Sequence, residues 1–321
     1  MTASEIPYRA TIDSTGLLNR MTSNFRNVMP SERFPAERNR YVLYINRVCP
    51  WAHRTIIVSA LKGLDDVIQV IEVDARDPTH GWYFSGHRGP AKDPIYGVRF
   101  LKELYKKADP HYNRRITIPV LWDKQHHTIV NNESADITRM LCYAFDVLLP
   151  AELREENKGP ASLIPRHLQS EMDELNSWVY DMVNNGVYKV GFATSQTAYN
   201  EHVTKLFIGL DRLEYHLSLP GHHPYLFGEH ITEADIRLFT TLVRFDVAYY
   251  TLFKCNIKMI RIDYPRLHAW LQRLYWDESP KTAGGAFKST TYFDVIKRGY
   301  SSVSAGNGVV PAGPVHPIMP L

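Results

Sequence analysis

The sequence predicts an α/β domain followed by an all-helical domain, in a chain of 321 residues. A β–α–β pattern with a cysteine at its first turn opens the α/β part, and a strand entered through a proline continues it. Beyond a stretch containing proline and glycine, apolar residues recur at helical spacing. These changes predict an N-terminal arm over 1–38, an α/β domain over 39–148, a linker over 149–165, a helical domain over 166–280 and a tail over 281–321.

Composition indicates a globular protein in a reducing compartment. The hydrophobic fraction is 44%, the charged fraction is 22% and the net charge is +3, which favours neither a nucleic-acid nor a membrane surface. Three scattered cysteines make no disulfide framework. No apolar run approaches the length of a membrane span, and the N-terminus lacks the apolar centre of a signal peptide. We therefore expect a cytoplasmic protein.

The first β–α–β unit carries a cysteine at its turn. A buried strand is expected over Tyr41–Ile45, because its residues are apolar, aromatic or β-branched. Pro50 then favours the first turn of a helix, where its missing N–H costs nothing. A second strand is expected over 67–73. This arrangement places Cys49 between a strand and a helix.

The rest of the α/β domain contains a long insertion and a second pair of strands. Residues 75–114 interrupt the pattern and include one short helix around 100–105. Strands are then expected over 116–122 and 128–130, followed by a helix over 132–145.

The position of Cys49 predicts a reactive thiol. The N–H groups of the first helical turn and the helix dipole favour the thiolate, which is the nucleophilic form. The alternative is a buried cysteine that packs as a small hydrophobe. Residue 52 is alanine, so the chain has no C-x-x-C pair. A second thiol must therefore come from outside, and glutathione is the expected donor.

Two further patterns point to a peptide-like ligand. In thioredoxin-like domains the strand beside the cysteine turn begins with a cis proline, and Pro119 stands there, preceded by Ile118. The alternative is an ordinary trans proline at a strand start. Glu133 and Ser134 open the next helix, where a carboxylate and free N–H groups suit the ammonium and carboxylate of a γ-glutamyl group. The alternative is that Ser134 only caps its own helix.

The helical domain shows apolar stripes and one helix-start motif. Thr232 to Asp235 resembles a capping box, with aspartate in place of glutamate. Aromatic residues that recur at helical spacing nearby are interpreted as core; they are Phe245, Tyr249, Tyr250 and Phe253.

Four motifs, in order, carry a family resemblance over about residues 40–298: V-C-P-W-A-H-R, T-I-P-V-L-W-D, I-V-N-N-E-S-A-D-I and N-N-G-V-Y-K-V-G-F-A. Together they resemble the glutathionyl-hydroquinone reductases, the Xi class of glutathione transferases. The resemblance implies a thioredoxin-like N-terminal domain, an all-helical C-terminal domain, a homodimer and glutathione as co-substrate, without a metal. It implies Cys49 as the nucleophile. It also implies a set of glutathione contacts: Trp82, Arg115, Ile118, Glu133 and Ser134.

Two tyrosines complete the expected site. Tyr188 matches the family tyrosine that faces the quinol, and Tyr300 is the candidate for a second one. The tail departs from the family pattern, since Gly299-Tyr300-Ser301 replaces His-Tyr-Tyr. The expected reaction is removal of glutathione from a glutathionyl-quinol by Cys49, followed by release of the mixed disulfide by free glutathione. The alternative role of each tyrosine is aromatic packing.

Two other functions remain open. An Omega-type thiol transferase or dehydroascorbate reductase would use the same Cys49. A non-catalytic binder of aromatic ligands would keep only the fold. A metal site is not expected, because the adjacent pairs His126-His127 and His222-His223 lack the spacing of a ligand set.

Overall fold

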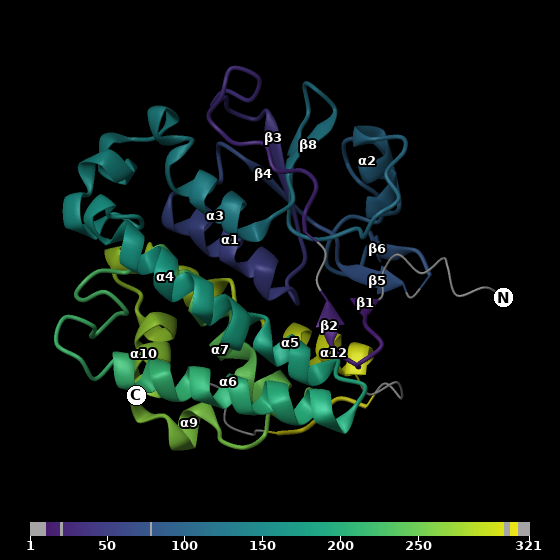
Figure 1. Ribbon diagram of the computed structural model, residues 1–321. Helices are drawn as coiled ribbons and strands as arrows, with labels where there is room; N and C mark the ends of the chain where they lie inside the picture. The colour runs from purple at the N-terminus through teal and green to yellow at the C-terminus, as the bar shows by residue number, and fades with distance from the viewer. Residues whose placement is uncertain (1–10, 20–21, 78, 305–308, 314–321) are drawn as a thin grey trace. The chain divides into compact units, whose positions relative to one another are not determined.

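The computed structural model describes residues 11–19, 22–77, 79–304 and 309–313. The chain divides into two compact units (Figure 1). Unit 1 contains Arg20–Arg154, and unit 2 contains Thr11–Asn19 and Glu155–Leu321. The segment expected as an arm is therefore shared between the units, because its residues 11–19 belong to unit 2.

Unit 1 is built on a four-stranded sheet with the order β4-β3-β7-β8. The β3–β4 pair is parallel, whereas β3–β7 and β7–β8 are antiparallel. The strands are β3 (Tyr41–Ile45), β4 (Gln69–Glu72), β7 (Val120–Asp123) and β8 (Thr128–Asn131). Two helices complete it and pack against each other, α1 (Pro50–Leu61) and α3 (Ser134–Tyr143). This mixed sheet with its β–α–β start is the predicted thioredoxin-like arrangement.

The central strand β3 explains why the sheet forms where it does. All five of its side chains are buried, with exposures of 0–1%, as expected of an apolar strand that is covered on both faces. On its two sides it pairs with β4 and β7. The chain that leaves β3 at Ile45 reaches α1 within five residues, and Cys49 lies in that turn.

The second half of the sheet differs from its prediction at one end. The strand expected from residue 116 begins at Val120, which is the first residue to pair with β3. Pro119 has no N–H to donate to the ladder, so regular pairing begins after it. The expected partner strand and the helix that follows it are both present, as β8 and α3.

The insertion between β4 and β7 contains a hairpin and a helix. Strands β5 (Ala75–Asp77) and β6 (Gly81–Tyr83) pair antiparallel, and the helix expected around 100–105 is α2 (Leu101–Ala108). Phe84 packs its ring against Tyr44 at 6.3 Å, which ties the hairpin to the central strand. The connection after α3 contains five short 3₁₀ turns: Asp146–Leu148, Ala151–Leu153, Glu155–Asn157, Gly159–Ala161 and Arg166–Leu168.

Unit 2 is almost entirely helical. Its longer helices are α4 (Gln169–Val179), α5 (Gly186–Gly191), α6 (Gln196–His216), α7 (Glu233–Arg244), α10 (Pro265–Trp276) and α12 (Phe293–Ser304). Shorter helical segments are Tyr180–Asn184, Phe245–Tyr249, α8 (Tyr250–Leu252), α9 (Ile260–Asp263), Pro280–Thr282 and α11 (Ala286–Ser289). A small hairpin of β1 (Thr11–Ile12) and β2 (Leu18–Asn19) belongs to the same unit.

The predicted capping box organises the start of α7. The Thr232 N–H and hydroxyl donate to the fully buried Asp235 at 2.9 and 2.8 Å, and the Trp270 indole of α10 donates to the same carboxylate at 2.9 Å. A buried carboxylate is tolerated here because several donors satisfy it. This confirms the capping box and extends it to a joint between α7 and α10.

The segment predicted as a tail, from residue 281, contains helices up to residue 304. Helices α11 and α12 lie within it, and Ile296 and Tyr300 of α12 are buried. The Gly-, Ser- and Pro-rich composition of the segment predicted a tail, although Ile296 and Tyr300 are four residues apart, as expected on one face of a helix. No helix in the described part of the chain is both long enough and apolar enough to cross a membrane.

A buried ion pair at the edge of unit 1 gives a stability prediction. Arg40 donates to Asp123 at 2.7 and 3.0 Å, and their side chains are 4% and 0% exposed. Arg40→Met should lower the free energy of unfolding by roughly 3–5 kcal/mol, because it leaves a buried carboxylate without its cation. Urea unfolding of the full chain measures the change.

The matched control is the exposed pair of Lys205 and Glu201, whose side chains are 53% and 46% exposed. Glu201→Gln should change the free energy of unfolding by less than about 1 kcal/mol. Equal effects of the two substitutions would contradict the distinction between a buried and an exposed pair.

Candidate active site

Cys49 caps the N-terminus of α1. Its backbone is extended, with φ −73° and ψ 119°, and Pro50 occupies the first helical position. Asn46 fixes the turn, because its side chain accepts from the Val48 N–H at 2.9 Å and donates to the Val73 carbonyl at 2.8 Å. The thiol is partly exposed and lies at the positive end of the helix dipole. This is the geometry in which a cysteine is readily ionised.

The backbone before β7 lies against the Cys49 thiol. The Ile118–Pro119 peptide bond is cis, which confirms the prediction from the sequence. The Cys49 Sγ contacts the Ile118 carbonyl oxygen at 3.6 Å. Two predicted site residues are thus in direct contact, although 69 positions separate them in the sequence.

A histidine and an arginine follow Cys49 along α1. His53 and Arg54 are both 1% exposed. The Arg54 guanidinium lies over the Trp51 ring, 4.5 Å from its centroid. Stacking on an aromatic face is a favourable environment for a buried guanidinium. The positive charge of Arg54 is therefore part of the packing of α1.

Glu133 and Ser134 form the start of α3. Glu133 is the capping residue, since its Oε1 accepts from the Ala135 N–H at 3.3 Å. Ser134 occupies the first helical position, and its hydroxyl is 3.5 Å from the same Oε1. The capping role that the sequence left open for Ser134 thus belongs to Glu133. Ser134 is 4% exposed, so its hydroxyl faces the inner side of the helix start.

Polar contacts join the start of α3 to the segment before β7. The Asn132 amide donates to the Thr117 hydroxyl at 3.2 Å and to the Tyr105 hydroxyl at 3.1 Å. Because Asn132 precedes Glu133 and Thr117 precedes Ile118, these bonds fix the start of α3 next to the Ile118 backbone. Cys49, Ile118, Glu133 and Ser134 are therefore held in one region of unit 1.

Arg115 and Trp82 are less closely connected to this region. Arg115 lies in the loop that leads to Thr117, and its carbonyl accepts from the Tyr112 hydroxyl at 2.9 Å. Its neighbour Arg114 is exposed and donates to Asn24 at 3.0 Å. Trp82 lies on β6, partly buried, with the Arg76 guanidinium 5.7 Å from its ring centroid. Within the described part of the chain, no hydrogen bond or ring contact joins Trp82 to Cys49 or to Glu133.

A cluster of phenols lies in unit 2. The hydroxyl of Tyr300 on α12 is 2.6 Å from that of Tyr188 on α5 and 2.8 Å from that of Tyr249. Tyr300 therefore bridges the other two phenols, and Tyr188 is the partly exposed member. The structure brings together the two predicted tyrosines and adds Tyr249, which the sequence reading had interpreted as core. The helical spacing of Tyr249 predicted that it is buried, but such spacing does not predict which group its hydroxyl hydrogen-bonds.

Burial keeps the two inner phenols protonated. Burial, and next the neighbouring Tyr188, raises the pKa of Tyr249 and of Tyr300 well above 10. Arg244 opposes this, since its buried guanidinium lowers the pKa of both. Tyr249 and Tyr300 are thus neutral hydrogen-bonding groups at physiological pH.

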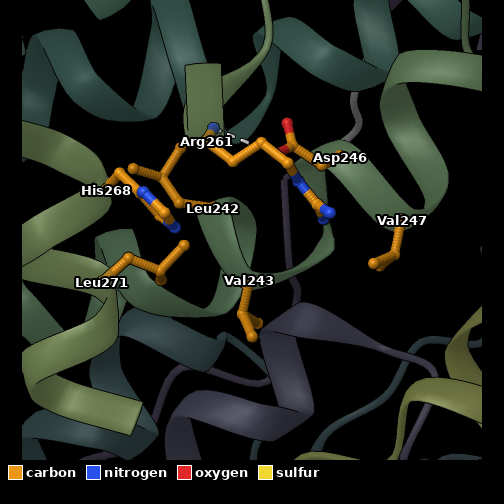
Figure 2. A pocket seen from close by; sticks show the side chains of 7 residues that line it. All are labelled: Leu242, Val243, Asp246, Val247, Arg261, His268 and Leu271. Atoms are coloured by element: carbon orange, nitrogen blue, oxygen red, sulfur yellow. Dashed lines mark hydrogen bonds and ion pairs between the residues drawn. The ribbon is translucent and has the colours of Figure 1, made fainter. Parts of the chain in front are cut away.

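A small pocket elsewhere in unit 2 contains none of the predicted site residues (Figure 2). Asp246 lies at its edge and accepts from the Ile260 N–H at 2.9 Å, the Arg261 N–H at 3.1 Å and the Arg261 Nε at 2.9 Å. These bonds anchor α9, which is a structural role. Groups of three or more potential metal ligands do not occur within the described residues.

Comparison with known proteins defines the class. The model of the glutathione S-transferase N-terminal domain matches residues 48–144, and that of the C-terminal domain matches residues 196–273. The chain is 46% identical to glutathione S-transferase omega-like 2 of Schizosaccharomyces pombe, over 94% of each chain. The chain therefore has the fold of a glutathione transferase and belongs to that family.

Two further relatives define the class within that family. Glutathionyl-hydroquinone reductase YqjG of Escherichia coli is 46% identical over 89% of this chain and 84% of its own. Its glutathione-bound structure has a TM-score of 0.79, covering 91% of this chain and 92% of that one. The Xi glutathione transferase of Phanerochaete chrysosporium is 45% identical, with a TM-score of 0.88 over 97% of both chains. The chain belongs to the Xi class of glutathione transferases, as its motifs predicted.

The environments of the three cysteines predict selective alkylation. Cys49 is partly exposed at a helix start, whereas Cys142 and Cys255 are buried, and burial raises the pKa of Cys255 well above 9. Iodoacetamide at pH 7 should modify Cys49 first, and the other two only after denaturation. Peptide mass spectrometry of the folded and the denatured protein measures this. Equal labelling of all three thiols in the folded protein would contradict it.

Proposed function

We propose that this protein reduces glutathionyl-hydroquinones, with Cys49 as the nucleophile and glutathione as the second substrate. The observation that carries the proposal is Cys49 at the start of α1, in contact with the Ile118 carbonyl beside the cis proline. The name of one relative supports it, since YqjG is a glutathionyl-hydroquinone reductase, and its solved structure contains glutathione.

In the first step the Cys49 thiolate attacks the sulfur of the glutathionyl-quinol. An S–S bond forms and the bond from sulfur to the ring carbon breaks. In the keto tautomer of the substrate that carbon already carries its hydrogen, so the released electron pair moves into the ring and gives the quinol anion. A proton on its oxygen completes the quinol, and Cys49 is left as a mixed disulfide with glutathione.

In the second step a glutathione thiolate attacks the glutathione sulfur of the mixed disulfide. Oxidised glutathione leaves, and the Cys49 thiolate is restored. The ring carbon gains both electrons in the first step, in which the Cys49 sulfur and the glutathionyl sulfur of the substrate are each oxidised by one electron to form the disulfide. In the second step the sulfur of free glutathione is oxidised and Cys49 is reduced back to its thiolate, so the overall reductant is glutathione.

Recognition of glutathione is proposed for the region around Cys49. The Ile118 backbone suits the cysteinyl unit, and Glu133 with Ser134 suits the γ-glutamyl end. The Glu133 carboxylate offers an acceptor to the ammonium, and the N–H groups at the start of α3 favour the carboxylate. Trp82 and Arg115 are proposed as further contacts.

The phenol cluster is proposed to serve the departing quinol. The Tyr188 hydroxyl is the partly exposed end of the chain of hydroxyls through Tyr300 to Tyr249. A hydroxyl whose direction is fixed by its neighbours is a preorganised donor for the oxygen on which charge develops. The inner phenols remain protonated, so they can donate along this chain.

The second candidate function is an Omega-type thiol transferase, which the name of the S. pombe relative favours. Such an enzyme would reduce small mixed disulfides with the same cysteine. The leaving group is then a thiolate, which needs no donor to a ring oxygen. A pair of substrates therefore distinguishes the two functions.

Tyr188→Phe tests the role of the phenol. Turnover of a glutathionyl-hydroquinone should fall about 10²-fold, because one preorganised donor is lost while the ring is kept. Turnover of a small glutathione mixed disulfide should change little. Steady-state assays of both substrates at one glutathione concentration measure the two rates.

The control is Tyr250→Phe, because this neighbouring tyrosine is partly exposed and the hydrogen bonds of the cluster join only Tyr188, Tyr300 and Tyr249 among the described residues. It should leave both rates unchanged. Equal slowing of both substrates by Tyr188→Phe would make Tyr188 a packing residue. Wild-type turnover of the disulfide alone would replace the proposal by the Omega-type function.

We also propose a cytoplasmic homodimer. The three free cysteines suit a reducing compartment, and the family resemblance implies the dimer. Sedimentation equilibrium of the full chain tests the oligomeric state, and a monomer at micromolar concentration would contradict it.

A further inference from the structure

The segment 22–27 runs along the edge of the sheet in unit 1. Arg26 forms an antiparallel bridge with Asn131 at the end of β8. The Asn27 N–H donates to the Val130 carbonyl, and the Asn132 N–H donates to the Phe25 carbonyl, both at 3.1 Å. Because β8 is the edge strand, the segment extends the sheet and takes a fixed register.

That register places Ser23 beside the start of α3. The Ser23 hydroxyl donates to Glu133 Oε2 at 3.1 Å, and it also lies 3.4 Å from the Asn132 carbonyl oxygen. The other oxygen of Glu133, Oε1, accepts from the Ala135 N–H and lies next to the Ser134 hydroxyl. Both carboxylate oxygens are therefore held. Among the described residues Oε1 has two donors and Oε2 has one, so Oε2 retains a lone pair for a ligand.

The two carboxylates at the start of α3, Asp136 and Glu133, have different hydrogen-bond donors. Arg26 binds Asp136 through two hydrogen bonds, from its Nε and, at 2.9 Å, from its Nη2. The hydrogen bonds that reach Glu133 from described residues come from neutral donors. Arg26 thus pairs directly with Asp136 and acts on Glu133 through longer-range attraction, which leaves the Glu133 carboxylate open to direct contact with a cationic ligand.

We propose that Ser23 is a positioning residue for glutathione, which holds the Glu133 carboxylate in the orientation that binds the γ-glutamyl ammonium. This inference rests on the proposed function, because it requires that glutathione binds at the start of α3. The inference gives the segment before the α/β domain an indirect part in ligand recognition, through Glu133. Ser23 itself contacts Glu133 and not the ligand.

A comparison of two ligands tests this directly. The background is the full chain with Cys49→Ser, which binds without turnover, and calorimetry gives dissociation constants. The ligands are glutathione and its analogue in which hydrogen replaces the γ-glutamyl amino group. The background should bind glutathione more tightly than the analogue. Adding Ser23→Ala should reduce this preference about three- to ten-fold by weakening glutathione alone.

Two matched variants complete the design. Ser31→Ala removes a serine hydroxyl a few residues beyond the segment. Ser31 accepts from the Phe34 N–H at 3.2 Å and not from Glu133, so the preference should be unchanged. Ser23→Thr keeps the hydroxyl and should retain the preference. Loss of preference with Ser23→Ala alone supports the inference.

The contrary outcomes are distinct. If Ser23→Ala keeps the full preference, or weakens both ligands equally, Ser23 does not position Glu133 and the inference is overturned while the proposed function stands. If the Cys49→Ser background already binds both ligands equally, the proposed recognition of the γ-glutamyl end fails, and the inference fails with it.

Discussion

The start of α1 is the constraint on which the proposed chemistry depends. A thiolate needs compensation for its charge, and the N–H groups of a first helical turn supply it without a permanent cation. Cys49 reaches that position because β3 is buried and central, so the strand end is fixed by two neighbours. The Ile118 carbonyl approaches the thiol from the segment that leads into β7 of the same sheet. One sheet therefore sets both the nucleophile and the backbone that would bind its ligand.

The surroundings also determine how the charges of the carboxylates at the start of α3 and the protons of the phenols in unit 2 are held. Asp136 is paired with Arg26, whereas Glu133 accepts hydrogen bonds from neutral donors and is proposed to bind the ammonium of a ligand. In unit 2, burial outweighs the nearby Arg244 and keeps Tyr249 and Tyr300 protonated. In both places the surroundings decide the protonation or charge state that the proposed chemistry requires.

Local patterns predicted most of the fold, since they depend on neighbours in the sequence. The strand over Tyr41–Ile45, the helix after Pro50 and the capping box at Thr232 all follow from such patterns and are present. Features set by distant contacts were missed or misplaced. The role of Ser23 depends on an edge pairing across about a hundred residues, and α12 lies in a segment whose composition indicated a tail.

In the candidate site, too, the features that follow from local patterns were predicted and those set by distant contacts were not. Cys49, the cis bond at Pro119 and the start of α3 were visible from residue types and order, because each is a strand or helix end. Tyr249 was not, since a stripe at helical spacing reveals burial but not the partner of a hydroxyl. Glu133 was expected only as a ligand acceptor, and its capping role required the coordinates.

The central claim is that Cys49 takes the glutathionyl group from a quinol. The direct measurement mixes the full chain with one equivalent of a glutathionyl-hydroquinone in the absence of free glutathione, and analyses the intact protein and its peptides by mass spectrometry. The account predicts one glutathionyl group on the Cys49 peptide, removable by a reductant, and one equivalent of released quinol. Release of quinol without this adduct, or an adduct on Cys142 or Cys255, would contradict it.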